Sequence, residues 1–134
     1  YLDIDGTMVH EDLTENYGKA AAGLEDFIVA LRPYDTYWLT THCRDGNPER
    51  AQTMMKRYLP PELHPDIDRI KPTVWDILKT EAIDFASDFI WFDNDVFAEE
   101  RAELAELGGD NKYVLEVDLR SNPRQLEEIV RDIL

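Results

Sequence analysis

Apolar positions along the chain follow two alternating patterns, short runs typical of strands and helically spaced positions typical of amphipathic helices. The run at 89–92 is almost continuously apolar, as expected of a strand covered on both faces. Strands that alternate with helices favour βαβ units and a mainly parallel sheet. The short runs predict strands at 1–4, 37–39, 89–92 and 113–117, with a fifth candidate at 68–71.

Five longer segments are predicted to be helices, at 21–33, 47–62, 71–83, 98–107 and 122–134. Asn47 and Asn122 each precede a proline and are predicted N-caps, and Gln125 completes a capping box with Asn122. Segment 60–72 is rich in proline and acid and is predicted to be a surface connection. The positions expected to face the core are Leu24, Phe27, Ile28 and Leu31; Ala51, Met54, Met55 and Tyr58; Val74, Trp75 and Leu78; and Leu126, Ile129, Val130 and Ile133.

The length of 134 residues and the hydrophobic content of 43% fit one globular domain over residues 1–134. The single cysteine, Cys43, excludes an internal disulfide. Together with the lack of an apolar leader, this favours a reducing, cytoplasmic setting. No apolar run approaches the ~20 residues needed to span a bilayer. The sequence leaves the oligomeric state open.

Acidic residues outnumber basic ones by 29 to 14, which gives a formal net charge of -15. Such a surface repels nucleic acid and anionic membranes, so neither is expected as a partner. An anionic substrate would need local positive charge, supplied by a metal ion or by a few placed bases.

Polar residues gather where the predicted strands end, which is where open α/β sheets bind their ligands. Lys71 stands directly before the third predicted helix. The polar groups that follow the strands are Asp3, Asp5, Gly6 and Thr7; Thr40, Thr41 and His42; and Asp93, Asn94 and Asp95.

Asp3 and Asp5 lie two residues apart on an extended segment and so share one face, about 7 Å apart. One carboxylate could attack phosphorus while the other exchanges protons with the leaving group and with water. Gly6 lets the backbone turn sharply there. The alternative is an Asp-Gly hairpin turn, but the next segment is helical rather than a returning strand, and a turn needs no Asp3.

The polar groups resemble, in chain order, the four motifs of the haloacid dehalogenase-like (HAD) superfamily. LDIDGT resembles the first motif, YWLTT the second and IWFDND the fourth, while Lys71 in RIKP resembles the third-motif lysine. The first motif is fairly specific, and the others gain force from their order and spacing. The resemblance covers the chain from end to end and implies a three-layer α/β/α Rossmann-like fold.

The resemblance makes Asp3 the nucleophile, Asp5 the acid/base and Lys71 the cation that holds the nucleophile and the phosphoryl group together. A threonine hydroxyl would bind the transferring phosphoryl oxygens, and Thr40 is preferred because it follows the strand directly. Thr41 would then offer its backbone N–H.

Mg²⁺ is the implied cofactor, because two carboxylates beside a phosphate need a hard cation between them. By resemblance its protein ligands are Asp3, the carbonyl of Asp5 and one acid of the fourth motif. Asp93 is preferred there and Asp95 is second. Asn94 departs from the family pattern, which often shows two adjacent acids or Gly-Asp.

His42 and Arg44 follow the second motif and are candidate substrate contacts, with a surface loop as the alternative. The segment HCRDGNPER approaches the HCx5R signature of cysteine-dependent phosphatases, but Arg50 comes one place late. Cys43 is therefore interpreted as an incidental residue.

Only about thirty residues separate Thr7 from Thr40, and a similar stretch precedes Lys71, so neither gap holds a cap domain. By resemblance the chain is a capless member whose cover is a flap at 8–21, and such members act on bulky phosphorylated substrates or oligomerise. The expected activity is a Mg²⁺-dependent phosphatase that forms an aspartyl phosphate. The alternative is a catalytically idle HAD-fold module that binds a phosphorylated or protein partner.

Overall fold

The computed structural model is a mixed α/β structure that describes residues 1–11 and 15–134. Within these ranges no helix is both long and apolar enough to cross a membrane. Three short 3₁₀ helices are η1 (Thr41–Cys43), η2 (Pro61–Leu63) and η3 (Lys79–Ala82). The α-helices and strands are α1 (Leu24–Ala30), α2 (Glu49–Lys56), α3 (His64–Asp68), β1 (Phe89–Asp93), α4 (Ala98–Leu107), β2 (Lys112–Glu116) and α5 (Gln125–Asp132).

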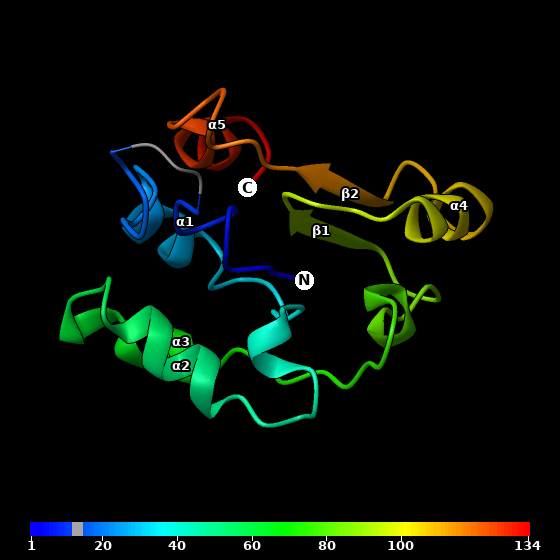
Figure 1. Cartoon of the computed structure of the whole chain (residues 1–134), viewed down its shortest axis with the longest axis horizontal. Coiled ribbons are helices and arrows are strands. Elements are labelled where there is room, and N and C mark those ends of the chain that lie inside the picture. Colours follow the sequence, from blue (N-terminus) through cyan, green and yellow to red (C-terminus); the bar gives the residue numbers. More distant parts are fainter. Residues whose placement is uncertain (12–14) are drawn as a thin grey trace.

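The two strands pair in parallel, with Phe89 opposite Lys112 and Asp93 opposite Glu116. The predicted strands at 1–4 and 37–39 lie beside this pair, but they are joined to it only through single bridges. Leu2 bridges in parallel to both Phe92 and Trp38. The chain start therefore runs alongside β1 in the middle of the molecule (Figure 1). Segment 68–71, the fifth candidate strand, contributes only the bridge between Lys71 and Tyr37.

Side chains of β1 alternate between two apolar clusters, as the period of a strand requires. Phe92 belongs to the larger cluster, where its ring meets that of Phe27 from α1 edge-on with centroids 5.4 Å apart. Phe89 and Trp91 belong to the smaller one. Both faces of β1 are thus covered, which explains its unbroken apolar sequence. Helices α1 and α5 lie together on one side of the molecule, and α2 and α3 lie together at another (Figure 1).

The predicted helices over 21–33, 47–62 and 98–107 are present as α1, α2 and α4. The Asn47 side chain accepts a hydrogen bond from the backbone N–H of Glu49 at 3.0 Å and so caps α2, although Pro48 is the residue directly before the helix. The predicted capping box of α5 is wrong. Gln125 instead ties α5 to the end of β2, donating to the carbonyl of Glu116 and accepting from the N–H of Asp118.

Segment 71–83 is not an α-helix, and only η3 is helical within it. Thr73 donates to the carbonyl of Trp38, and Val74 bridges to Asp45, so this part is extended across the neighbouring loop. Val74, predicted to be buried, is 68% exposed. The β-branched residues Thr73 and Val74 favour an extended backbone there, despite the apolar spacing.

Segment 60–72 is more than a surface connection. It contains η2 and α3, whose leucine and isoleucine side chains enter the core. Leu63, Ile67 and Ile70 are all buried. Near the end of the chain, the prediction that Ile133 faces the core is wrong, because this residue is 41% exposed.

Candidate functional site

The centre of the candidate site is an ammonium held between two buried carboxylates. The Nζ of Lys79 lies 3.2 Å from Oδ1 of Asp3 and 2.6 Å from Oδ2 of Asp93. Asp3 follows the extended segment that pairs with β1, and Asp93 ends β1, so neighbouring segments deliver both acids to the same edge. Asp3 and Asp93 were both predicted site residues, and the structure brings them together.

Lys71 does not reach this centre, so its predicted position beside Asp3 is wrong. Its Nζ lies 3.4 Å from Asp35 Oδ1, and its side chain is 53% exposed. Lys71 pairs with Tyr37, at the start of the extended segment that ends at Thr40. Three residues of extended chain span about 10 Å, so Lys71 lies towards the opposite end of these segments.

Lys79 is held in place through its backbone by two glutamates. The backbone N–H of Lys79 donates to Oε2 of Glu100 at 2.7 Å, and the other oxygen of Glu100 accepts from the N–H of Phe97. The Glu81 carboxylate accepts from the backbone N–H groups of residues 76–78, directly before Lys79. Glu100 is only 1% exposed, so α4 supplies a buried anchor for η3.

The charges at the centre do not balance, because two carboxylates face one ammonium. Burial, with the negative charge of Asp93 as the second cause, raises the pKa of Asp3 to about 7 although Lys79 opposes the shift. Burial disfavours the charge of Lys79, yet the two carboxylates raise its pKa above its ordinary value. Above the raised pKa of Asp3 the centre therefore holds one uncompensated buried negative charge, which an added cation would relieve.

Asp5 faces His42 rather than the lysine. Oδ2 of Asp5 lies 2.6 Å from Nε2 of His42, and the Asp5 side chain is 35% exposed. His42 is carried by η1, whose first turn is capped by Thr40 through a bond from the His42 N–H to the threonine hydroxyl at 3.3 Å. The second predicted motif thus positions a residue that orients the candidate acid.

Gly6 forms the sharp turn predicted from its position. Its φ is 77°, in the left-handed region, and its N–H donates to the carbonyl of Val9 at 2.7 Å. A Cβ on Gly6 would lie 2.2 Å from Nδ2 of Asn94. Asn94 therefore packs against the turn, and its amide donates to Glu11. A side chain at position 6 would therefore strain the backbone and displace Asn94.

The predicted flap folds back on itself at its base, where Val9 bridges antiparallel to Ala20 and the His10 N–H donates to Lys19. Met8, Val9 and His10 are buried. Residues 12–14 of the predicted flap lie outside the described part of the chain.

Thr40 is fully buried, whereas Thr41 is exposed on η1. The hydroxyl oxygen of Thr40 accepts a hydrogen bond, and its proton has no acceptor within the described part of the chain, so it can be donated to a ligand. Cys43, next along η1, is fully buried, and desolvation raises the pKa of its thiol. That environment disfavours a thiolate nucleophile.

No group of three or more His, Cys, Asp or Glu side chains within the described ranges is arranged to hold a metal ion. The donor chemistry at the centre nevertheless suits Mg²⁺, because carboxylate oxygens are its usual protein ligands. Among residues 1–11 and 15–134, Oδ1 of Asp93 accepts a hydrogen bond only from the Asp95 N–H, at 3.0 Å, and so keeps acceptor capacity. Asp95 itself is exposed, so Asp93 is the better placed of the two candidate ligands.

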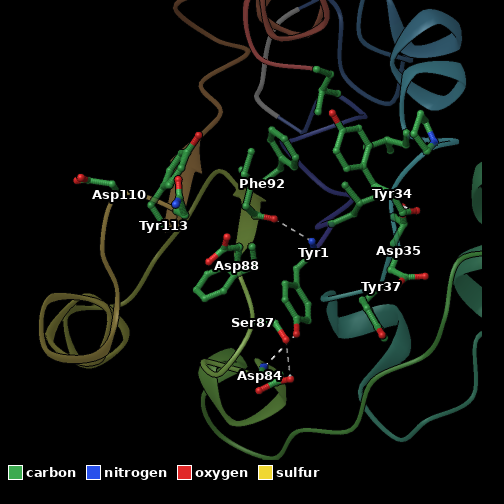
Figure 2. Close-up of a pocket in the computed structure, with 18 residues that line it drawn as sticks. Tyr1, Tyr34, Asp35, Tyr37, Asp84, Ser87, Asp88, Phe92, Asp110 and Tyr113 are labelled. Atoms are coloured by element: carbon green, nitrogen blue, oxygen red, sulfur yellow. Dashed lines mark hydrogen bonds between the residues drawn. The ribbon is translucent and has the colours of Figure 1, made fainter.

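Besides a cavity of about 560 Å³ lined by Gly6, His10 and Asn94, two cavities lie at opposite ends of these segments. One of about 800 Å³ is lined by Thr41, His42 and Arg44 and adjoins the candidate site. The guanidinium of Arg44 lies over the Trp75 ring, 4.6 Å from its centroid. The other cavity, of about 670 Å³, surrounds Tyr1 and contains none of the predicted site residues (Figure 2).

Lys79 is the residue of the candidate site that the sequence interpretation missed. Its position along the chain was a usable signal. Lys79 follows an extended segment and lies fourteen residues before Asp93, and a chain of that length can return to the edge at which β1 ends. Comparisons with models of protein families, with curated proteins and with solved structures give no match.

Proposed function

We propose that this protein is a phosphomonoester hydrolase that uses Asp3 as its nucleophile, in a HAD-like fold of the capless type. The observation that carries the proposal is the contact of Lys79 with both Asp3 and Asp93, beside the Asp5–His42 pair. An ammonium fixed beside a buried carboxylate is suited to hold a phosphoryl oxygen next to the attacking atom. In this proposal Lys79 takes the role that the sequence interpretation gave to Lys71.

The reaction has two balanced steps. In the first, a carboxylate oxygen of Asp3 bonds to phosphorus as the bond to the leaving oxygen breaks, and Asp5 gives its proton to that oxygen. In the second, Asp5 takes a proton from water, whose oxygen bonds to phosphorus while the Asp3–phosphorus bond breaks. Inorganic phosphate leaves, and both aspartates regain their starting states. Thr40 and Lys79 hold the phosphoryl oxygens throughout.

Mg²⁺ fits this proposal because the buried centre carries one more negative charge than positive. Asp3, Asp93 and the carbonyl of Asp5 would hold it. When bound, the ion would neutralise charge on the phosphoryl group and orient it. The two carboxylates would attract the ion, and the bound ion would offset their repulsion of an anionic substrate.

The extended segments at 2, 37–38 and 71 beside the two strands, with both faces of β1 covered, are compatible with a three-layer Rossmann-like arrangement. We adopt that arrangement as part of the proposal. It brings the candidate residues to the carboxyl ends of adjacent segments, where ligands bind in such sheets.

The direct test is hydrolysis of para-nitrophenyl phosphate by the purified protein with Mg²⁺ and after chelation. We expect Mg²⁺-dependent turnover that Asp3→Asn lowers by ~1,000-fold or more, because it removes the nucleophile. Asp110→Asn, an exposed acid at the opposite end, is the matched control and should retain full activity.

Covalent labelling separates this proposal from an idle binding module. Beryllofluoride should bind to Asp3 of the wild-type chain as a mimic of the phosphoryl group. A rapid acid quench during turnover should preserve the aspartyl phosphate on the same residue. Hydrolysis that persists in Asp3→Asn would refute the assigned nucleophile. A chain that binds phosphate esters but never turns them over would instead favour the binding module.

A further inference from the structure

The cavity beside His42 is lined by more arginines than acids, although the molecule as a whole is strongly acidic, and only Arg44 among these arginines has an ion-pair partner in the described ranges, Asp76 at 3.8 Å. Its walls hold three arginines, Arg44, Arg50 and Arg57, against the two acids Asp45 and Glu49. Across the whole chain acids outnumber bases by 29 to 14. A basic cavity in so acidic a chain selects for an anion, because the remaining surface repels one.

Two of these arginines are unpaired. Arg50 and Arg57 form no ion pair and no side-chain hydrogen bond with any residue in the described ranges, whereas most other arginines are paired. They lie seven residues apart, at the two ends of α2, with Thr53 and Met54 between them on the same face. Two helical turns separate them by about 10 Å along the axis, so both guanidinium groups can address one extended ligand.

The cavity lies on the side of the site from which a leaving group would depart. Under the proposed function Asp5 protonates the leaving oxygen, so the leaving group lies against Asp5. His42 contacts Asp5 at 2.6 Å and also forms one wall of the cavity. A leaving group that extends past His42 therefore enters the basic cavity, whose volume of about 800 Å³ suits a small organic molecule.

We propose that this cavity binds the leaving group of the substrate, and that this group carries a second anion, a carboxylate or a further phosphate, which Arg50 and Arg57 recognise. The inference rests on the proposed function, because it takes the direction of departure from Asp5. Half-buried Met54 and Tyr58 provide an apolar wall for the carbon skeleton between the two anionic ends.

A matched pair of esters tests the inference, namely phenyl phosphate and para-carboxyphenyl phosphate, which differ by one carboxylate. We expect the wild-type kcat/KM to favour the carboxylated ester by ~10-fold, a typical effect of a charge-assisted hydrogen bond. Arg50→Gln and Arg57→Gln should each reduce this preference, and the double variant should abolish it without slowing phenyl phosphate. Arg131→Gln is the control, because it makes the same charge change on α5, where Arg131 pairs with Asp132.

The outcomes separate the two proposals. Hydrolysis of both esters with no preference, or with a preference that survives in the double variant, overturns the inference and leaves the proposed function standing. If neither ester is hydrolysed, the proposed function fails, and calorimetric titration of the same esters decides the remaining part of the inference, namely that Arg50 and Arg57 recognise a second anion in the cavity. Tighter binding of the carboxylated ester that the double variant loses supports it, and equal affinities overturn it. A phosphoserine peptide hydrolysed faster than both esters, with equal rates in wild type and double variant, also overturns it.

Discussion

Lys79 forms hydrogen bonds with two carboxylates that are almost out of contact with solvent. Its Nζ contacts Asp3 and Asp93, whose side chains are 9% and 1% exposed. Burying three charges costs free energy that hydrogen bonds only partly recover, so packing alone does not account for such a cluster. Because one carboxylate of this cluster has no cation to balance it, the cluster is suited to bind a further cation.

The two lysines provide a sharp comparison at the residue scale. Lys79→Met should lower phosphatase activity by ~100-fold or more, because it removes the only positive charge that contacts Asp3 among the described residues. Lys71→Met should leave the rate unchanged, since Lys71 pairs with exposed Asp35. Steady-state kinetics on both variants checks this, and equal losses would contradict the assignment of Lys79.

The raised pKa of Asp3 predicts a pH-dependent stability. Because the folded pKa of about 7 exceeds the ordinary value of 3.8, the stability from this group is complete below pH 3.8 and is lost as pH rises through 7. Asp3→Asn should therefore raise the melting temperature in the absence of divalent ions, by several degrees at pH 8 and by little at pH 4. Exposed Asp88→Asn is the control. A variant less stable than wild type at pH 8 would refute the unbalanced charge.

The sequence was enough to predict that Asp3, Asp5 and Gly6 lie together at the end of an extended segment. It was not enough to predict which of the two lysines joins them. Asp3, Asp5 and Gly6 occupy adjacent positions, so local geometry alone fixes their proximity. The lysine arrives from a distant segment, and its position depends on how far that segment runs before it turns. That length is set by the pairing of Lys71 with Tyr37, which no local pattern in the sequence reveals.

At the scale of elements, η3 has only four residues and cannot fix Lys79 by its own hydrogen bonds. Glu100 reaches it from α4 and binds the backbone N–H of Lys79 and that of Phe97. The anchor is buried, so removing the carboxylate takes away the acceptor of two backbone N–H groups that are shielded from bulk solvent. The longest helix of the described residues, α4, thereby fixes the position of Lys79 in η3.

Glu100→Ala should destabilise the fold by about 3 kcal/mol, because it leaves two backbone N–H groups without acceptors. It should also lower activity by ~10-fold or more well below the melting temperature, since Lys79 loses its anchor. Glu106→Ala, exposed on the same helix, controls for the charge.

Urea denaturation and steady-state kinetics together measure the two effects of the Glu100 change. Leu126→Ala in the core should cost a similar free energy, about 2–5 kcal/mol, while leaving kcat near its wild-type value. If Glu100→Ala were destabilised but fully active, the anchor would matter for folding alone.

Helices whose apolar residues recur with a clear helical period were predictable. Segments whose conformation is set by tertiary hydrogen bonds were not. The helical spacing of Leu24, Phe27 and Ile28 predicts α1, and all three are buried. Segment 71–83 shows similar spacing, yet the hydrogen bond from Thr73 to Trp38 holds its beginning extended. A tertiary contact that competes with local preference decides such segments, and the sequence does not display it.

At the scale of the whole molecule, a net charge of -15 makes the folded state sensitive to every cation. Sodium ions screen the repulsion between all surface carboxylates, whereas a bound Mg²⁺ would act at Asp3 and Asp93 alone. The two effects can be separated by matching ionic strength, because only the second saturates with an affinity set by the site.

We therefore expect MgCl₂ to raise the free energy of unfolding more than NaCl at the same ionic strength. The surplus should approach about 2.7 kcal/mol when Mg²⁺ reaches ~100 times its dissociation constant. Asp93→Asn should lose this surplus and keep the response to NaCl, since it removes one acid of the centre. Asp110→Asn makes the same charge change at the far end of the molecule and should keep both responses. Identical responses to the two salts in the wild-type chain would mean that Mg²⁺ acts only by screening, and the metal-dependent form of the mechanism would have to be abandoned.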